Sequence, residues 1–142
     1  MTYKIKIATT DDEIKATFSV MQQLRPHLVD QHYITLIRRL QQKSGYTLVF
    51  LSTNKTTKAV MGFRVSESLA CGHYLYIDDL VTDETTRSMG YGKLLIDWAT
   101  NYAKQLGCQE LHLDSGIQRH GAHRFYLRER MDIVFYHFRK KI

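Results

Sequence analysis

The feature that most constrains this chain is a glycine-containing segment at residues 87–93, which reads RSMGYGK. It follows a predicted strand at residues 74–81 and leads into a predicted helix at residues 91–106. Gly90 and Gly92 lack a Cβ atom, so a ligand can approach the backbone closely there. The first turn of a helix also presents unpaired N–H groups and the positive end of its dipole. The segment therefore predicts a binding site for a phosphate or pyrophosphate group.

Two better-known glycine motifs do not match this segment. A Walker A loop would need glycine at the position of Arg87 and serine or threonine at that of Leu94. A dinucleotide-binding fingerprint would need a third glycine in place of Leu95. What remains is the pattern R-x-x-G-x-G after a strand that ends Asp-Leu-Val. A plain glycine-rich turn before a core helix is the alternative, and the preceding strand, the arginine and the long amphipathic helix argue against it.

Length and composition favour one globular domain over residues 1–142. Hydrophobic residues make up 44% of the chain, yet no apolar run approaches the ~18–20 residues that span a membrane. The first residues alternate polar and apolar and lack the apolar centre of a signal peptide. We therefore expect a cytoplasmic protein without a membrane partner. Cys71 and Cys108 fit reduced thiols, and neither has a metal-ligand partner at C-x-x-C spacing, so we expect no metal site.

The charge balance favours acidic partners. Twenty basic and 14 acidic side chains give a formal net charge of +6. A phosphorylated cofactor and a nucleic acid both satisfy that preference, and composition alone does not separate them. The basic residues are scattered, however, and no basic helix face or aromatic RNA-recognition signature is present.

Periodicity and turn signals predict an alternating series of strands and helices. We expect strands at residues 3–7, 46–51, 59–65, 74–81, 110–114 and 133–138, the third pairing antiparallel with the second. We expect helices from the Thr10–Glu13 capping box to Pro26, over residues 30–45, over residues 91–106 and over residues 120–130. The order β-α-α-β-β-β-α-β-α-β indicates one mixed α/β domain.

This order resembles that of the GNAT-type N-acetyltransferases. The segment from Asp78 to Gly92 is similar to the signature strand and acetyl-coenzyme A loop of that family, and residues 122–126, AHRFY, are similar to its later A-x-x-F-Y helix. Two departures are Arg119, where the family often has asparagine, and Arg130-Met131, where it usually has Gly-Phe. The resemblance implies a central, mostly antiparallel twisted sheet of about six to seven strands flanked by about four helices.

The resemblance also implies a site. The strand end would pair with the pantetheine arm, and the backbone amides of the glycine segment would hold the pyrophosphate of acetyl-CoA, with the Arg87 side chain adding a charge-assisted contact. The cofactor-binding residues so implied are Leu80, Val81, Thr82, Arg87, Ser88, Met89, Gly90, Tyr91, Gly92 and Lys93. Tyr126 matches the family tyrosine near the sulfur, and we assign it as the general acid. Its alternative role is packing beside Phe125 with the hydroxyl in water.

The general base is less defined by sequence. Adjacent strand residues point to opposite faces, so Asp78 and Asp79 would not both face the acceptor. We choose Asp79 as the catalytic base. The alternative for either carboxylate is exposure to solvent or pairing with a nearby arginine. Asp114 lies at the end of the next strand, where its alternative is to cap a turn, and His123 lies one helical turn from Tyr126, where it can simply form a hydrogen bond.

The implied activity is acetyl-CoA-dependent N-acetylation of a primary amine, on a small molecule or a protein, by direct attack without a covalent enzyme intermediate. A GNAT-shaped regulatory module that binds CoA without turnover is the alternative, and a small nucleic-acid-binding domain is a third hypothesis that only the charge supports. The acceptor amine, the length of the acyl group and the oligomeric state stay open. Two-subunit assembly is common in the family, but no sequence feature requires a homodimer.

Overall fold

A computed structural model describes residues 2–142. The chain divides into two compact units, Met1–His112 and Leu113–Ile142. The first unit holds a sheet whose strands are β1 (Lys4–Ile7), β2 (Thr47–Thr53), β3 (Thr56–Ser68), β4 (Gly72–Thr82) and β5 (Glu110–Leu113), the last residue of which already belongs to the second unit. Its helices are α1 (Asp11–Ala16), α2 (Phe18–Leu24), α3 (Asp30–Ser44), the 3₁₀ helix η1 (Glu84–Thr86) and α4 (Tyr91–Gln105). The second unit contains α5 (His120–Arg128).

The five strands lie in the order in which they occur along the chain. Strands β1 to β4 pair antiparallel with their neighbours, and α4 connects β4 to β5. The β3–β4 ladder is interrupted once. Gly62 pairs with Asp79 and Phe63 with Ile77, so Asp78 is an extra residue opposite no partner. This β-bulge breaks the alternation of side chains on which the choice between Asp78 and Asp79 depended.

The predicted first helix is in fact two short helices. Its start is as expected, because the Thr10 hydroxyl accepts from the Glu13 N–H at 3.1 Å and the Glu13 carboxylate accepts from the Thr10 N–H at 3.0 Å. The break comes at Thr17, whose N–H and hydroxyl both donate to the Ile14 carbonyl, at 3.0 and 2.6 Å. An α-helical N–H donates to the carbonyl four residues earlier, whereas Ile14 is only three residues before Thr17. The α-helical hydrogen-bond pattern is therefore interrupted here, and a new helix begins at Phe18.

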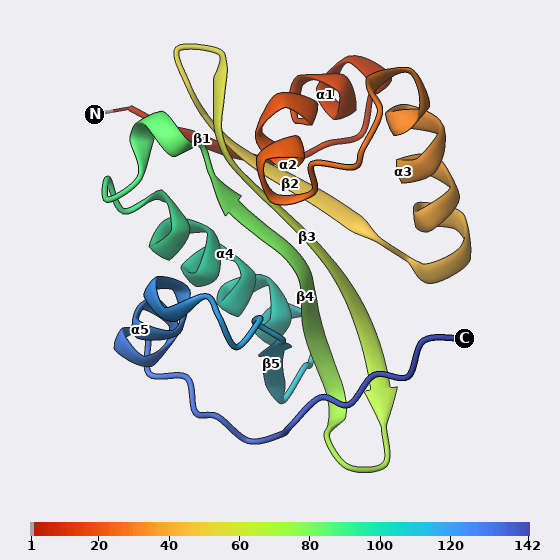
Figure 1. Cartoon of the computed structure of the whole chain (residues 1–142), viewed down its shortest axis with the longest axis vertical. Helices are drawn as coiled ribbons and strands as arrows, with labels where there is room; N and C mark the ends of the chain where they lie inside the picture. Colours follow the sequence, from red (N-terminus) through yellow and green to blue (C-terminus); the bar gives the residue numbers. More distant parts are fainter. Residues whose placement is uncertain (1) are drawn as a thin grey trace. The chain divides into compact units, whose positions relative to one another are not determined.

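Helices cover both faces of the sheet (Figure 1). Val60 of β3 belongs to the core that α1, α2 and α3 form, together with Ile14, Val20 and Ile37. Phe63 points to the opposite face, where its ring meets Trp98 and Tyr102 of α4 at centroid distances of 6.3 and 5.5 Å. Burial on both faces explains the near-continuous apolar runs of β2 and β3.

The predicted last strand, residues 133–138, is wrong. Residues 131–142 form neither helix nor strand, and the apolar side chains of Ile133, Phe135 and Phe138 are exposed. A strand needs the backbone of a neighbour along its length, and β-branched or aromatic residues do not substitute for that partner. Within residues 2–142 the sheet therefore has five strands where about six to seven were expected, and splitting the first predicted helix gives five α-helices where about four were expected.

Candidate functional site

The glycine segment forms the loop expected between β4 and α4. Ser88 and Gly90 both have left-handed backbone conformations, with φ of +70° and +83°. A serine rarely adopts such a φ, which costs free energy and is found most often at functional sites. A Cβ atom built on Gly90 would meet no atom within 4 Å, which leaves space beside the main chain. Left-handed residues in a loop turn successive N–H groups toward one side, the arrangement that binds anions.

The loop ends at the N-terminus of α4. Gly90 is the N-cap residue and forms no side-chain capping bond. The N–H groups in the first turn of an α-helix point along the axis and carry partial positive charge. No acidic side chain lies in the first turn of α4. These features suit a phosphate group at the helix terminus.

The strand end that precedes this loop has one edge without a strand. Leu80, Val81 and Thr82 pair with Met61, Val60 and Ala59 of β3. On the other side of β4 the neighbouring strand is β5, which has only four residues. The N–H of Gln109, just before β5, donates to the His73 carbonyl at 2.8 Å, near the start of β4. Strand β5 is therefore too short to reach Leu80, and among the strands of residues 2–142 none pairs with this edge of β4 there. An edge of this kind is able to pair with an extended ligand, as in β-strand addition.

Asp79 lies in a polar network within the first unit. One carboxylate oxygen accepts from Arg25 Nε at 3.0 Å and the other accepts from the Tyr46 hydroxyl at 2.7 Å. Arg25 also donates to the Asp78 carbonyl at 2.9 Å, across the β-bulge. Burial, and then the adjacent Asp79 carboxylate, raise the pKa of Tyr46 well above its ordinary value, so Tyr46 stays protonated as a donor. A carboxylate offers about four acceptor positions, and this network uses two of them.

The Asp78 side chain pairs with a different arginine, Arg64. Both of its oxygens accept from Arg64, at 2.7 and 2.9 Å, in a two-bond arrangement. Arg64 also lies over the Tyr76 ring, with its Cζ atom 5.4 Å from the centroid. Both carboxylates are thus paired with arginines, which is the alternative that the sequence had left open. Of the two, Asp79 is the less exposed, at 16% of its side chain against 28%.

The start of the loop is tied to helix α2. Gln23 Nε2 donates to Asp83 Oδ1 at 2.8 Å, and Gln23 Oε1 accepts from the Glu84 N–H at 2.9 Å. Hydrogen bonds from Gln23 and Thr85 lower the pKa of Asp83. Sequence reasoning missed Gln23, as it missed Arg25 and Tyr46, because residues more than 30 positions apart in the chain carry no local signal of their contact.

Tyr126 belongs to the second unit, on α5. Its ring lies at a centroid distance of 5.4 Å from that of Phe125. Burial raises the pKa of the Tyr126 phenol, an effect that the positive charge of Arg119 opposes. A phenol is protonated at neutral pH with or without this shift, so the group carries a proton that it can donate. The structure brings the loop, the open strand edge and Asp79 into the first unit, and it presents Tyr126 as part of the second.

Two other candidates in the second unit are engaged in local contacts. His137 Nδ1 lies 2.6 Å from Asp114 Oδ2, so this carboxylate pairs with a histidine. His123 Nε2 lies 2.7 Å from the Gly116 carbonyl oxygen. Asp114 and His123 therefore both have structural partners within the second unit.

Comparison with known proteins identifies the family. A sequence model of the acetyltransferase (GNAT) family matches residues 11–131. Uncharacterized N-acetyltransferase YhdJ of Bacillus subtilis (strain 168) is 36% identical over 139 residues, covering 97% of this chain and 98% of that protein.

No helix within residues 2–142 is long and apolar enough to cross a membrane.

Solved structures share the fold. A GNAT family acetyltransferase from Staphylococcus aureus subsp. aureus USA300_TCH1516 aligns with a TM-score of 0.83 and 17% identity, covering 100% of both chains. AAC(6')-Iy in complex with the bisubstrate analogue CoA-S-monomethyl-acetylneamine aligns with a TM-score of 0.77 and 13% identity, covering 99% of this chain and 100% of that one. The match to the family model over residues 11–131 and the 36% identity with the Bacillus subtilis protein show that the chain belongs to the GNAT acetyltransferase family.

Proposed function

We propose that this protein transfers an acetyl group from acetyl-CoA to a primary amine by direct attack of the amine on the thioester. The observation that carries the proposal is the combination of the loop with left-handed Ser88 and Gly90, the uncapped N-terminus of α4 and the open edge of β4 at Leu80. A diphosphate and an extended amide-containing arm are the two parts of CoA that such a surface fits. The CoA analogue bound by the structurally similar AAC(6')-Iy supports this choice of acyl donor.

In this proposal the backbone amides of residues 87–93 hold the pyrophosphate, with Arg87 adding a charged contact. The backbone of Leu80, Val81 and Thr82 forms hydrogen bonds to the pantetheine arm and aligns the thioester. Apart from the contact of Arg87, this binding uses main-chain groups and the space that the two glycines leave. The departures from the family pattern at Arg119 and Met131 lie outside these residues and do not affect it.

The chemistry needs one proton acceptor and one proton donor. The attacking amine forms the N–C bond as the C–S bond breaks, and its proton passes to Asp79, which has acceptor positions beyond those taken by Arg25 and Tyr46. The phenol of Tyr126 then supplies a proton to the departing thiolate. The phenol enters the reaction protonated, because its pKa lies above neutral pH.

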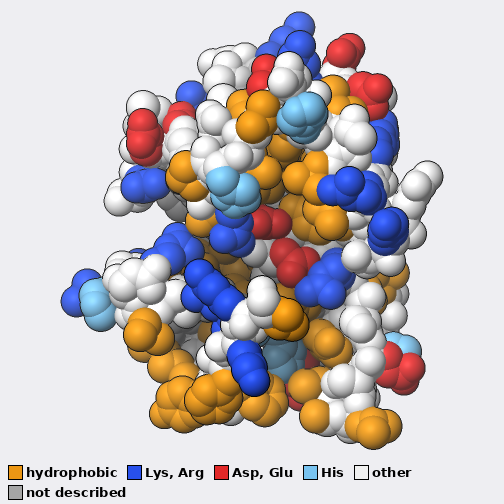
Figure 2. All heavy atoms as spheres, turned by 45° about the vertical axis from the view of Figure 1, so that its right-hand side comes forward, with side chains coloured by type: hydrophobic (Ala, Val, Ile, Leu, Met, Phe, Trp, Pro, Cys, Tyr) orange, Lys and Arg blue, Asp and Glu red, His pale blue; other side chains and the backbone are white. Residues whose placement is uncertain are grey.

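The acceptor is an amine of a small molecule or a protein. Nucleic acid is not part of the proposal, because the sequence has no basic helix face and no aromatic RNA-recognition signature. On the face seen in Figure 2, Lys and Arg side chains lie among acidic and apolar ones.

Release of free thiol from acetyl-CoA across a panel of primary amines tests the proposal. We expect amine-dependent release, and a Tyr126→Phe variant with turnover lowered by about 10²–10⁴-fold and little change in acetyl-CoA affinity. Tyr3→Phe, which removes the hydroxyl of an exposed tyrosine, is the matched control and should leave the rate unchanged.

Three outcomes would contradict parts of the proposal. CoA binding without thiol release for any amine would indicate the regulatory module instead of an enzyme. An unchanged rate for Tyr126→Phe would remove the acid role from that residue. An unchanged rate for Asp79→Asn would remove the base role from Asp79, since an amide does not accept the amine's proton.

A further inference from the structure

The hairpin end of the sheet brings together three side chains that bind metal ions in proteins. The ligand atoms of Cys71, Glu110 and His112 all lie within 4.8 Å of one another. Sequence spacing did not reveal this group, because Cys71 is separated from the other two residues by β4 and α4. The sequence-based expectation of no metal site considered only neighbours along the chain.

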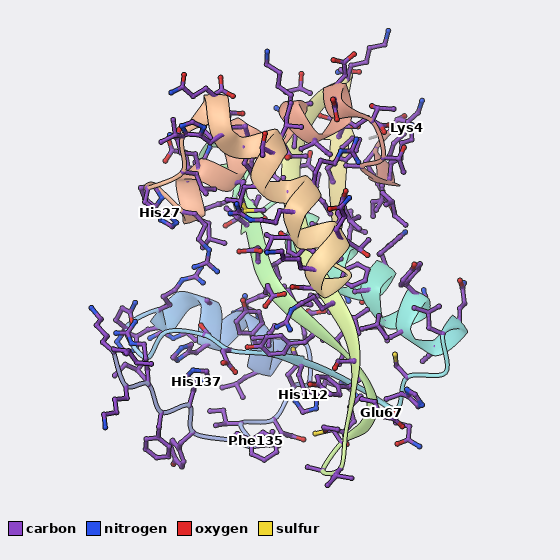
Figure 3. The ribbon with its side chains drawn as sticks, turned by 90° about the vertical axis from the view of Figure 1, so that its right-hand side faces the viewer. Lys4, His27, Glu67, His112, Phe135 and His137 are labelled. Atoms are coloured by element: carbon purple, nitrogen blue, oxygen red, sulfur yellow. The ribbon has the colours of Figure 1, made fainter. Side chains whose placement is uncertain are left out.

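The sheet itself holds the three residues close. Cys71 immediately precedes β4, and its N–H donates to the Ser68 hydroxyl at 3.0 Å across the turn. Glu110 and His112 are two residues apart on β5, so their side chains lie on one face of the strand. The His112 ring packs edge-on against Tyr74 of β4, with a centroid distance of 5.4 Å. Figure 3 labels His112 of β5 and Glu67 of β3, and both lie toward the hairpin end of β3 and β4.

The arrangement is close to that of a metal site. His112 Nε2 lies 2.6 Å from Glu110 Oε1, a hydrogen-bond distance. Nitrogen and oxygen ligands at ~2.0–2.2 Å from a tetrahedral ion are roughly 3.3–3.5 Å apart, so binding requires the two atoms to separate by less than about 1 Å. The Glu110 side chain is 51% exposed, which leaves it room for this shift, whereas that of His112 is only 16% exposed.

The donor set selects the ion. One thiolate, one imidazole and one carboxylate form a mixed soft and borderline set that suits Zn²⁺, whereas Mg²⁺ and Ca²⁺ require mostly oxygen ligands. A thiolate and a carboxylate together also balance the charge of a divalent cation. Three protein ligands leave a fourth tetrahedral position for water or another donor.

We propose that Cys71, Glu110 and His112 bind a zinc ion that joins the β3–β4 turn to β5. The site is separate from the loop before α4, because β4 has eleven residues and spans about 33 Å from Gly72 to Thr82 at about 3.3 Å per residue. Its role is structural: the ion fastens the short strand β5 to the start of β4. The proposal does not depend on acetyl transfer.

Cobalt titration of the reduced, metal-free full chain tests the proposal, because Co²⁺ replaces Zn²⁺ at such sites and a cobalt–thiolate bond absorbs in the near ultraviolet. We expect one equivalent of Co²⁺ to produce the thiolate charge-transfer band and the visible bands of tetrahedral cobalt, and one equivalent of Zn²⁺ to abolish both. Cys71→Ser should lose the charge-transfer band, and His112→Ala or Glu110→Gln should weaken cobalt binding at least about 10-fold.

Cys108→Ser is the matched control, since Cys108 is the other free cysteine and lies outside the cluster. This variant should keep the spectrum and the rise in thermal unfolding midpoint that zinc produces, while Cys71→Ser should show no such rise. Circular dichroism of each variant without metal establishes that it is folded. Absence of the charge-transfer band in the parent chain would overturn the proposal. So would its loss in Cys108→Ser, or its full retention in both His112→Ala and Glu110→Gln.

Discussion

Replacing Gly62 with alanine should destabilise the protein because the space for a side chain is already occupied. A Cβ atom built on Gly62 would lie 1.7 Å from the Tyr46 hydroxyl oxygen, 2.2 Å from Cζ and 2.6 Å from Cε1. Tyr46 is only 6% exposed, so its ring has little room to withdraw. The same hydroxyl donates to Asp79 at 2.7 Å. The substitution therefore displaces a buried ring and breaks a hydrogen bond to a carboxylate together.

The expected change in the free energy of unfolding combines two destabilising effects and one stabilising effect. Overpacking of a core costs about 1–3 kcal/mol, and a hydrogen bond to a charged group contributes about 1.5–3 kcal/mol. Alanine is favoured over glycine in a strand by roughly 0.5–1 kcal/mol, which offsets part of the loss. Because one movement of the ring causes both losses, they do not add fully, and we expect Gly62→Ala to lower the free energy of unfolding by about 2–4 kcal/mol.

Urea denaturation followed by circular dichroism measures this free energy. The clash is isolated by repeating the substitution in a Tyr46→Val background, because valine lacks all three of the atoms that the new methyl group meets. There Gly62→Ala should be close to neutral. Gly121→Ala in α5 is the matched control: a Cβ at Gly121 meets no atom within 4 Å, so this change should stabilise the protein slightly.

The reasoning would be refuted if Gly62→Ala lowered the free energy of unfolding by less than about 0.5 kcal/mol. It would also be refuted if the loss were the same with Tyr46 and with Val at position 46, since the cost would then come from the backbone of β3 and not from the ring.

Two further predictions concern helices α1 and α3, which pack on the same face of the sheet. Thr10→Ala removes the hydroxyl that accepts from the Glu13 N–H, and should lower the free energy of unfolding in urea by about 0.5–2 kcal/mol; an unchanged value would mean that water replaces the cap at no cost. Burial raises the pKa of Tyr33 to about 12, from 10.0, so the folded chain keeps this proton at a pH where the unfolded chain loses it. The resulting stability is present below pH 10 and is lost as the pH rises toward 12. A Tyr33→Phe variant should show a shallower loss over this range in denaturant titrations, and an identical slope would show that Tyr33 does not carry the effect.

Several elements could be predicted because their signals are local. The capping box at Thr10 is confirmed, as are α3 and the left-handed Gly45 that ends it, with φ of +65°. Helix α4 begins at Tyr91 and ends at Gln105, within one residue of the prediction. Each of these depends on backbone conformation or side-chain period within a few residues, which the sequence states directly.

The misses arose where a distant residue decided the outcome. Thr17 divides the first helix, and its hydroxyl lies 2.7 Å from that of Tyr33, sixteen positions further on. Asp78 is the extra residue of a β-bulge in β4, where the pairing with β3 shifts between Gly62 and Phe63. The apolar run at residues 133–138 has strong β propensity and still forms no strand in the described structure, because propensity does not supply a neighbouring backbone.

The sequence by itself predicted the strands and α-helices from β2 to α5, the glycine-containing loop before α4 and the resemblance that the family comparison confirmed. Only the tertiary structure decided the partners of the carboxylates: Arg25 reaches Asp79 from 54 positions away, and Gly62 leaves the space that lets Tyr46 reach the same group. It alone placed Cys71 beside Glu110 and His112. The physical reason is that φ, ψ and capping preferences act over a few residues, whereas hydrogen bonds, ion pairs and metal ligation act across whatever distance in sequence the folded chain closes.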